Sequence, residues 1–189
     1  MTGQLGFISK LHYNNLKSHF LGKTGERVPS LQEVISQFLP SIELNIEFKS
    51  FEPELVKLTA ELVRASGLHS KVIFSSFHLD PLLCLRKHYP DLFRALLIEN
   101  NDLDVVDLMR RLDSKIVHPH GSIVTASFMG MAHEHGWTVY PWFDKASEDG
   151  QDRSILWAGL HGLGIDGLCT NYPGELIQWL RKVSNKIPS

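Results

Sequence analysis

An acid and a base lie close together on one face of a short strand-like segment, residues 42–49. Successive side chains of a strand point to opposite faces. One face of this segment is apolar, and the other carries Glu43, Asn45, Glu47 and Lys49. A carboxylate oxygen is a hard ligand for Mg²⁺ or Ca²⁺, and an adjacent ammonium can neutralise a phosphate bound to the same ion. Glu47 and Lys49 therefore suit the hydrolysis of a phosphodiester.

The environment of this polar face depends on the kind of sheet that contains the strand. If the apolar face packs on helices, the polar face lines the interior of a barrel. Glu47 and Lys49 then fall at the carboxyl-terminal strand end, where barrel active sites form. A solvated face of an antiparallel edge strand gives the same alternation. The segment alone does not separate these two interpretations.

Repeated β–α units run along the rest of the chain. Apolar or β-branched runs alternate with longer amphipathic runs, a pattern typical of a parallel sheet with helical connections. The predicted strands are residues 42–49, 71–77, 95–99, 115–120, 138–143 and 165–171. An open doubly wound sheet is the alternative, but no glycine-rich nucleotide turn follows the first of these strands. An α/β barrel has eight units and about 250 residues, so we expect residues 1–189 to form one partial barrel domain with six of the eight units.

Helix-end signals support the same division of the chain. Ser30 and Glu33 have the spacing of a capping box. Asp80 followed by Pro81 predicts an N-cap and a first-turn proline. Gly67 lies where a helix C′ glycine belongs.

Five motifs resemble, in order, those of the glycerophosphodiester phosphodiesterase family. They are GERVPSLQEVI at residues 25–35, LNIEFK at 44–49, SSF at 75–77, VHPHGSIVT at 117–125 and GIDGLCTNYPGEL at 164–176. The first two are similar to the family's GERIPTLEEVL and LNIEIK, and the last is similar to GVDGIITDRPD. The resemblance covers nearly the whole chain and implies a TIM-type (β/α) barrel of the PLC-like phosphodiesterase kind.

The resemblance also implies an activity and residue roles. Members of that family hydrolyse glycerophosphodiesters to glycerol 3-phosphate and an alcohol, with a divalent metal and two histidines as general acid and base. It implies a phosphoric diester hydrolase in which Glu47 is a ligand of Mg²⁺ or Ca²⁺ and Lys49 contacts the phosphate. Trp142 matches an aromatic that lines the family's substrate pocket, with core packing as the other interpretation. Here the motif reads VYPWFDK rather than VNVWTVN, which leaves the role of Asp144 open.

Three other polar residues lie near predicted strand ends. Ser75 falls in the SSF motif but lacks the neighbours of a nucleophile elbow, so it is interpreted as pocket lining or structural. His118 and His120 share a strand face and could hold a metal together. The proline between them equally suits a structural pair, which we favour, with His118 kept as a candidate for pocket lining.

Several motifs of the resembled family do not occur in the sequence. Its first two strands carry an HRG motif, an E-x-D metal pair and a second histidine, and residues 2–18 resemble the stretch that follows them. We therefore expect the first two β–α units and both acid–base histidines to be missing, and the chain alone to be very weakly active. A truncated gene model, a split enzyme and a degenerate paralogue are the explanations. Open sheet edges predict self-association or binding of a complementing N-terminal fragment.

Composition excludes some classes of partner. The net charge is −2 and both signs are scattered, so no basic stripe exists for a nucleic acid or an anionic membrane, and a small molecule is favoured. No apolar run approaches a membrane span, and no signal peptide is evident, although one could be lost with a missing N-terminus. Cys84 and Cys169 have apolar neighbours and are expected to be buried, reduced thiols, which suits the cytoplasm.

Two other functions remain open at this stage. One is a degenerate, non-catalytic barrel that binds a phosphate-bearing ligand or a partner chain through its exposed strand edges. The other is a different metal-dependent phosphodiesterase on a related barrel, of the phospholipase or sphingomyelinase-like kind.

Overall fold

A parallel five-stranded sheet forms the centre of the computed structural model, which describes residues 10–17, 20–21, 25–100 and 102–184. Its strands follow one another in chain order, β3-β4-β5-β6-β7. Their bounds are Leu44–Glu47, Val72–Ser76, Phe93–Ile98, Ile116–Pro119 and Thr138–Val139. Each of these five lies within or across a predicted strand. A doubly wound sheet reverses its strand order at a switch point, whereas this order continues in one direction, as in a barrel.

The sixth predicted strand joins the sheet through one isolated bridge. Trp142, three residues beyond β7, forms parallel bridges with His120 on one side and Cys169 on the other. The segment around Cys169 therefore lies beside the end of β7, although it does not form a regular strand. A G-x-G-x-x-G spacing does occur at residues 162–167. It precedes this segment instead of following a strand, so it is not a nucleotide-binding turn.

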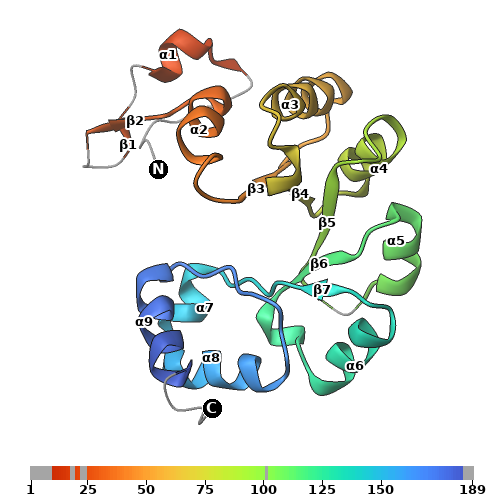
Figure 1. Ribbon diagram of the computed structural model, residues 1–189, viewed down its shortest axis with the longest axis vertical. Helices are drawn as coiled ribbons and strands as arrows, with labels where there is room; N and C mark the ends of the chain where they lie inside the picture. Colours follow the sequence, from red (N-terminus) through yellow and green to blue (C-terminus); the bar gives the residue numbers. More distant parts are fainter. Residues whose placement is uncertain (1–9, 18–19, 22–24, 101, 185–189) are drawn as a thin grey trace.

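Helices connect the strands and cover one side of the sheet. The connecting helices are α3 (Pro53–Ala65), α4 (Leu79–His88), α5 (Val105–Leu112) and α6 (Ala126–Glu134). Figure 1 shows them along the outer side of an arc of strands. Short 3₁₀ turns, η2 (His69–Lys71) and η3 (Gly121–Ile123), precede β4 and α6.

The remaining elements lie at the two ends of the arc. The amino-terminal end carries α1 (Tyr13–Lys17), β1 (Phe20–Leu21), β2 (Glu26–Arg27) and α2 (Leu31–Phe38). The carboxyl-terminal end carries α7 (Lys145–Asp149), α8 (Arg153–Gly162) and α9 (Pro173–Ser184). Strands β1 and β2 form a separate antiparallel pair. Most of residues 2–18, which resemble a family segment, lies outside the described residues.

The main core fills the space between the sheet and the outer helices. Each of the strands β4 to β7 contributes one side chain that points toward the helices and is at most 1% exposed: Phe74, Leu96, Val117 and Val139. Phe48 stacks on Phe74 with ring centroids 5.7 Å apart. Helix-facing positions of the strands are thus apolar, which leaves the opposite, inner face for polar side chains.

Two helix-end predictions are confirmed and one is wrong. Ser30 and Glu33 form both halves of a capping box at the start of α2. Gly67 follows the C-cap of α3 with φ of 71°, the left-handed region that favours glycine. Helix α4, however, begins at Leu79 with His78 as its N-cap. Asp80 therefore lies inside the first turn, because the N-cap is two residues earlier than the one at Asp80 that Pro81 had indicated.

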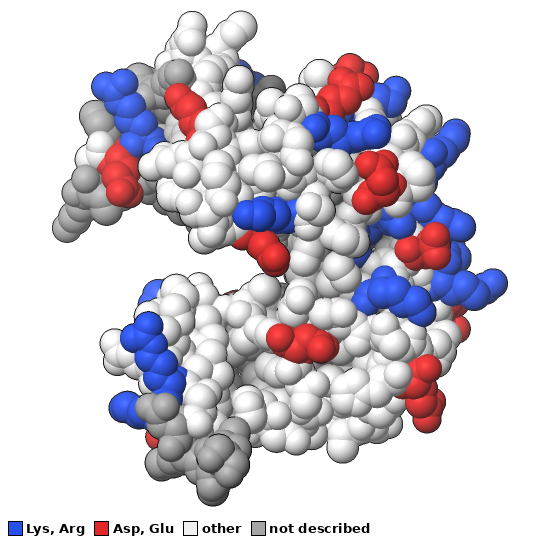
Figure 2. All heavy atoms as spheres, in the orientation of Figure 1, with Lys and Arg blue, Asp and Glu red and all other residues white. Residues whose placement is uncertain are grey.

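The arc is open on one side. Among the described residues, β3 pairs only with β4 in the parallel sheet. Figure 2 shows the surface hollowed between the amino-terminal and carboxyl-terminal elements. The unpaired edge of β3 thus faces the side from which the inner face of the sheet is reached.

Two further properties concern the thiols and the helices. Both cysteines are free, with Cys84 half-buried and Cys169 exposed. The expectation that both are buried is wrong, because the segment around Cys169 lies at the open end of the arc. In the described part of the chain, every helix is too short or too polar to cross a membrane.

Candidate functional site

Strand register places most of the predicted site residues on one face of the sheet. Glu47 is the parallel partner of Ser75, and Ser75 is the partner of Ala95. Two residues further along β5, Leu97 is the partner of His118. Partners in a parallel ladder, and residues two apart on a strand, point to the same side. Glu47, Ser75 and His118 therefore share the inner face, opposite the helices.

Glu47 and Lys49 are in direct contact at the carboxyl-terminal end of β3. The Lys49 Nζ donates to Glu47 Oε1 at 2.7 Å. The Lys49 side chain is 78% exposed and that of Glu47 is 28% exposed. An exposed pair of this kind contributes little to stability. Its two charges nevertheless lie at the strand ends where a barrel binds its substrate.

Ser75 and His118 lie deeper on the inner face and have unused hydrogen-bonding atoms. Ser75 is 0% exposed and His118 is 1% exposed. Within the described ranges, neither the Ser75 hydroxyl nor either His118 ring nitrogen has a hydrogen-bond partner. Burial lowers the pKa of His118 to about 4, because removal from water disfavours the charged ring. His118 is therefore neutral at pH 7 and is not a cationic anion-binding group.

Aromatic rings cluster at the ends of β4, β6 and β7. The Phe77 and Trp142 rings meet edge to face with centroids 5.3 Å apart. The His120 ring lies 4.8 Å from Trp142 on a second side. Phe77 is 41% exposed, so the cluster reaches the surface. Trp142 is thus both packed and close to solvent, which accommodates its predicted role in a substrate pocket.

His120 also has polar neighbours. Its Nδ1 lies 2.7 Å from Ser122 Oγ, and its Nε2 lies 3.7 Å from Asp144 Oδ2. Hydrogen bonds from the hydroxyl and backbone N–H of Ser147 lower the pKa of Asp144, so this carboxyl is ionised at neutral pH. The sequence interpretation treated His120 as structural and left Asp144 open. The signal for their meeting was the position of each at a predicted strand end.

A buried carboxylate holds this region together. Glu148 in α7 is 0% exposed. It accepts hydrogen bonds from the Thr170 hydroxyl and from the backbone N–H and side-chain amide of Asn171. These bonds join α7 to the segment that bridges Trp142. Sequence reasoning missed Glu148, because one glutamate in a short polar stretch carries no recognisable pattern.

A divalent metal does not fit the described residues alone. The described ranges contain no group of three or more His, Cys, Asp or Glu side chains arranged to hold an ion. Mg²⁺ and Ca²⁺ need about six or more oxygen ligands, and Glu47 supplies one carboxylate. Glu47 can therefore serve only as one ligand of a site that other groups complete.

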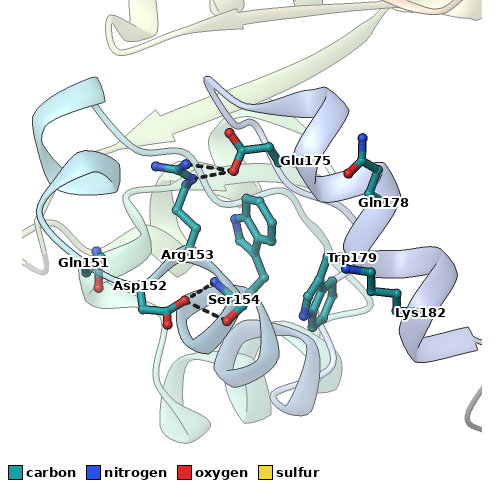
Figure 3. Close-up of a pocket in the computed structure, with 9 residues that line it drawn as sticks. Gln151, Asp152, Arg153, Ser154, Glu175, Gln178, Trp179 and Lys182 are labelled. Atoms are coloured by element: carbon teal, nitrogen blue, oxygen red, sulfur yellow. Dashed lines mark hydrogen bonds and ion pairs between the residues drawn. The ribbon is translucent and has the colours of Figure 1, made fainter.

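A separate hollow of about 400 Å³ lies between α8 and α9 (Figure 3). Arg153 donates to Glu175 Oε2 at 2.7 Å across its rim, and Asp152 accepts from both the backbone N–H and hydroxyl of Ser154. Trp157 also lines it. Because neighbouring groups already occupy both carboxylates, we place the candidate site at the strand ends instead.

Comparisons with known proteins agree with this geometry. A sequence model of the glycerophosphoryl diester phosphodiesterase family matches residues 1–175. A Bacillus subtilis (strain 168) protein named as a candidate glycerophosphodiester phosphodiesterase, YhdW, is 24% identical over 164 residues. The match covers 82% of this chain but only 63% of YhdW, so the chain spans less than two-thirds of that relative's length.

Solved structures give the same result for the fold. A candidate glycerophosphodiester phosphodiesterase from Galdieria sulphuraria has a TM-score of 0.85 and 25% identity, over 94% of this chain and 73% of its own. A phosphodiesterase from Oleispira antarctica, solved with its product sn-glycerol-3-phosphate, has a TM-score of 0.80 and 22% identity. That match covers 93% of this chain and 73% of the Oleispira chain. Because the family model matches residues 1–175 and the parallel sheet has the fold of these relatives, this chain belongs to the glycerophosphoryl diester phosphodiesterase family and has its α/β-barrel fold.

Proposed function

We propose that this chain takes part in the metal-dependent hydrolysis of glycerophosphodiesters to glycerol 3-phosphate and an alcohol. The observation that carries the proposal is the contact between Glu47 and Lys49, 2.7 Å apart at the carboxyl-terminal end of β3. Family membership supports the reaction class, and strand-end location supports a role in substrate binding. The small-molecule substrate agrees with the product complex of the Oleispira relative.

Each predicted residue has a distinct role in this proposal. Glu47 is one ligand of Mg²⁺ or Ca²⁺, which would polarise a phosphoryl oxygen when bound. Lys49 contacts the phosphate and stabilises the negative charge that develops there. Trp142 lines the substrate pocket, and Ser75 and His118 line its floor. We also propose a cytoplasmic location.

Turnover by this chain alone is expected to be slow. The described residues supply a single carboxylate to the metal, and the Lys49 ammonium already contacts it. We propose that a segment equivalent to the first two β–α units of a complete barrel supplies further ligands. The unpaired edge of β3 is where such a segment would pair, because a strand edge exposes free N–H and C=O groups. Self-association through this edge is the alternative arrangement.

A non-catalytic role is the second candidate function. It is favoured by the same absence of a three-ligand group among the described residues. In that case the inner face binds a phosphate-bearing ligand or a partner chain without turning it over. Lys49 would still be required for a phosphate ligand, whereas Glu47 would not.

Binding and turnover experiments separate the two candidates. Binding of sn-glycerol 3-phosphate is measured by calorimetry for the wild type, Glu47→Gln and Lys49→Met. Turnover of glycerophosphocholine is followed by ³¹P NMR with Mg²⁺ or Ca²⁺. Slow metal-dependent turnover that Glu47→Gln removes supports the enzyme. Binding that needs Lys49 but not Glu47, without turnover, supports the non-catalytic candidate.

A further inference from the structure

Large apolar side chains lie exposed at the carboxyl-terminal ends of three neighbouring strands. Phe51 lies in the segment after β3, Phe77 directly follows β4, and Leu103 lies in the segment after β5. Leu55 joins them from the first turn of α3. These four residues, here called the apolar rim, are between 40% and 51% exposed. Because neighbouring strands lie about 4.8 Å apart and β3, β4 and β5 are consecutive in the sheet (Figure 1), the rim occupies one part of the barrel mouth.

An open sheet edge does not account for this exposure. Strand β4 lies between β3 and β5, and β5 lies between β4 and β6. A segment that paired with the edge of β3 would therefore still leave Phe77 and Leu103 beside their present neighbours. Single exposed apolar residues are ordinary on a protein surface, whereas a group of them beside a candidate site marks a binding surface.

The apolar rim is continuous with the candidate site. At one end, Phe51 follows two residues after Lys49, whose Nζ lies 2.7 Å from Glu47 Oε1. Further along, the Phe77 ring meets the Trp142 ring edge to face with centroids 5.3 Å apart. A ligand whose phosphate lies at Lys49 can thus extend over the rim without leaving the mouth.

The charges beside the rim indicate what it binds. Five exposed carboxylates lie within three residues of rim positions along the chain: Glu52, Glu54, Asp80, Asp102 and Asp104. Their negative charges repel an anionic membrane surface or a free fatty acid. An uncharged hydrocarbon chain carries no such penalty and gains free energy by covering apolar side chains. The rim therefore fits a hydrocarbon chain that is part of the substrate.

We propose that the substrate of this site is a lysophospholipid, a glycerophosphodiester whose glycerol carries one acyl chain, and that the apolar rim binds this chain; the inference rests on the proposed function. Hydrolysis consumes one water molecule. The bond from phosphorus to the oxygen of the head-group alcohol breaks, the water oxygen bonds to phosphorus, and one water proton goes to the alcohol oxygen. The products are a monoacylglycerol 3-phosphate and the free alcohol.

The contribution of the acyl chain to binding provides the test. Calorimetry on the full chain compares 1-lauroyl-lysophosphatidylcholine, kept below its critical micelle concentration, with glycerophosphocholine, which has the same head group and no acyl chain. We expect the lysophospholipid to bind at least about tenfold more tightly. The double variant Phe51→Ser/Leu103→Ser should lose this gain and keep the affinity for glycerophosphocholine. Leu58→Ser and Ile155→Ser, at exposed apolar positions on α3 and α8 outside the rim, are the matched controls and should keep the gain.

The outcomes separate this inference from the proposed function. Equal affinity of the wild type for the two ligands, or a gain that the double variant keeps, overturns the inference alone when binding of glycerophosphocholine still needs Lys49. No binding of either ligand, or binding that Lys49→Met leaves unchanged, counts against the proposed function, and the inference falls with it.

A second copy of the chain is the other occupant that such a surface could take. Sedimentation velocity of the wild type and the double variant Phe51→Ser/Leu103→Ser tests it. The same oligomeric state in both proteins is expected. If the double variant changes the oligomeric state and leaves the affinity for the lysophospholipid unchanged, the rim binds protein and the inference is overturned.

Discussion

Replacement of His118 by leucine should change how the stability of the protein depends on pH. His118 is 1% exposed, and neither of its ring nitrogens has a hydrogen-bond partner among the residues that the structure describes. Its pKa is lowered to about 4 from the ordinary 6.5, because burial disfavours the charged ring. The folded state thus binds the proton less readily than the unfolded chain does.

The sign and size of the effect follow from linkage. Between about pH 6.5 and pH 4 the unfolded chain binds a proton at this ring and the folded chain does not. The free energy of unfolding therefore falls as the pH falls through this window. The difference of 6.5 − 4 = 2.5 pKa units, at about 1.4 kcal/mol per unit, corresponds to a loss of about 3 kcal/mol. Below pH 4 both states are protonated and this contribution stops changing.

Urea denaturation followed by circular dichroism at pH 7, 6, 5 and 4 measures this loss. The wild type should lose about 3 kcal/mol more than His118→Leu across that range. Carboxylates that titrate in the same window are shared by both proteins, so their contribution cancels. His88→Gln, at an exposed site, should keep the wild-type dependence. The same pH dependence in the wild type and His118→Leu would refute the reasoning that the ring is buried and neutral.

Three other changes test the site and its support. Glu148→Gln removes a charge that accepts three hydrogen bonds and should lower the unfolding free energy by about 3 kcal/mol in urea denaturation; a loss below about 0.5 kcal/mol would contradict the idea that these bonds hold α7 to the segment around Cys169. Gly121→Ala places a Cβ against the buried Phe143 ring and should cost about 1–3 kcal/mol in the same assay, whereas an unchanged midpoint would show that the ring moves freely. In a barrel completed by the first two β–α units, Lys49→Met should lower kcat/KM for a glycerophosphodiester, with a loss of about 2–4 kcal/mol of transition-state stabilisation, and a wild-type value would make Lys49 structural.

The sequence predicted the strands well because their signal is local. Alternation of polar and apolar residues around Glu47 follows directly from strand geometry, and residues 42–49 contain β3, at Leu44–Glu47. The capping box at Ser30 was equally readable, since both of its partners lie within four residues. The start of α4 was not, because the N-cap is His78, a residue without a capping side-chain bond.

Features that depend on distant parts of the chain were beyond a reading of the sequence. Glu148 and Asn171 are separated by 23 residues and meet only because the last segment lies beside the end of β7. His120 and Asp144 meet because the chain after β6 bridges the chain after β7 at His120 and Trp142. The roles of Glu47, Lys49, Ser75 and Trp142 stay predictions, because their positions at or near the strand ends support these roles without testing them.

The most direct test of the central claim is hydrolysis of glycerophosphocholine and glycerophosphoethanolamine with Mg²⁺ or Ca²⁺, followed by ³¹P NMR. The chain alone is compared with a fusion that carries the first two β–α units of the Galdieria relative at its amino terminus. We predict little or no release of sn-glycerol 3-phosphate from the chain alone and metal-dependent release from the fusion, lost in Glu47→Gln. A folded fusion that releases no product with either ion, or equal release when Glu47 is replaced, would contradict the claim that these strand ends form a phosphodiesterase site.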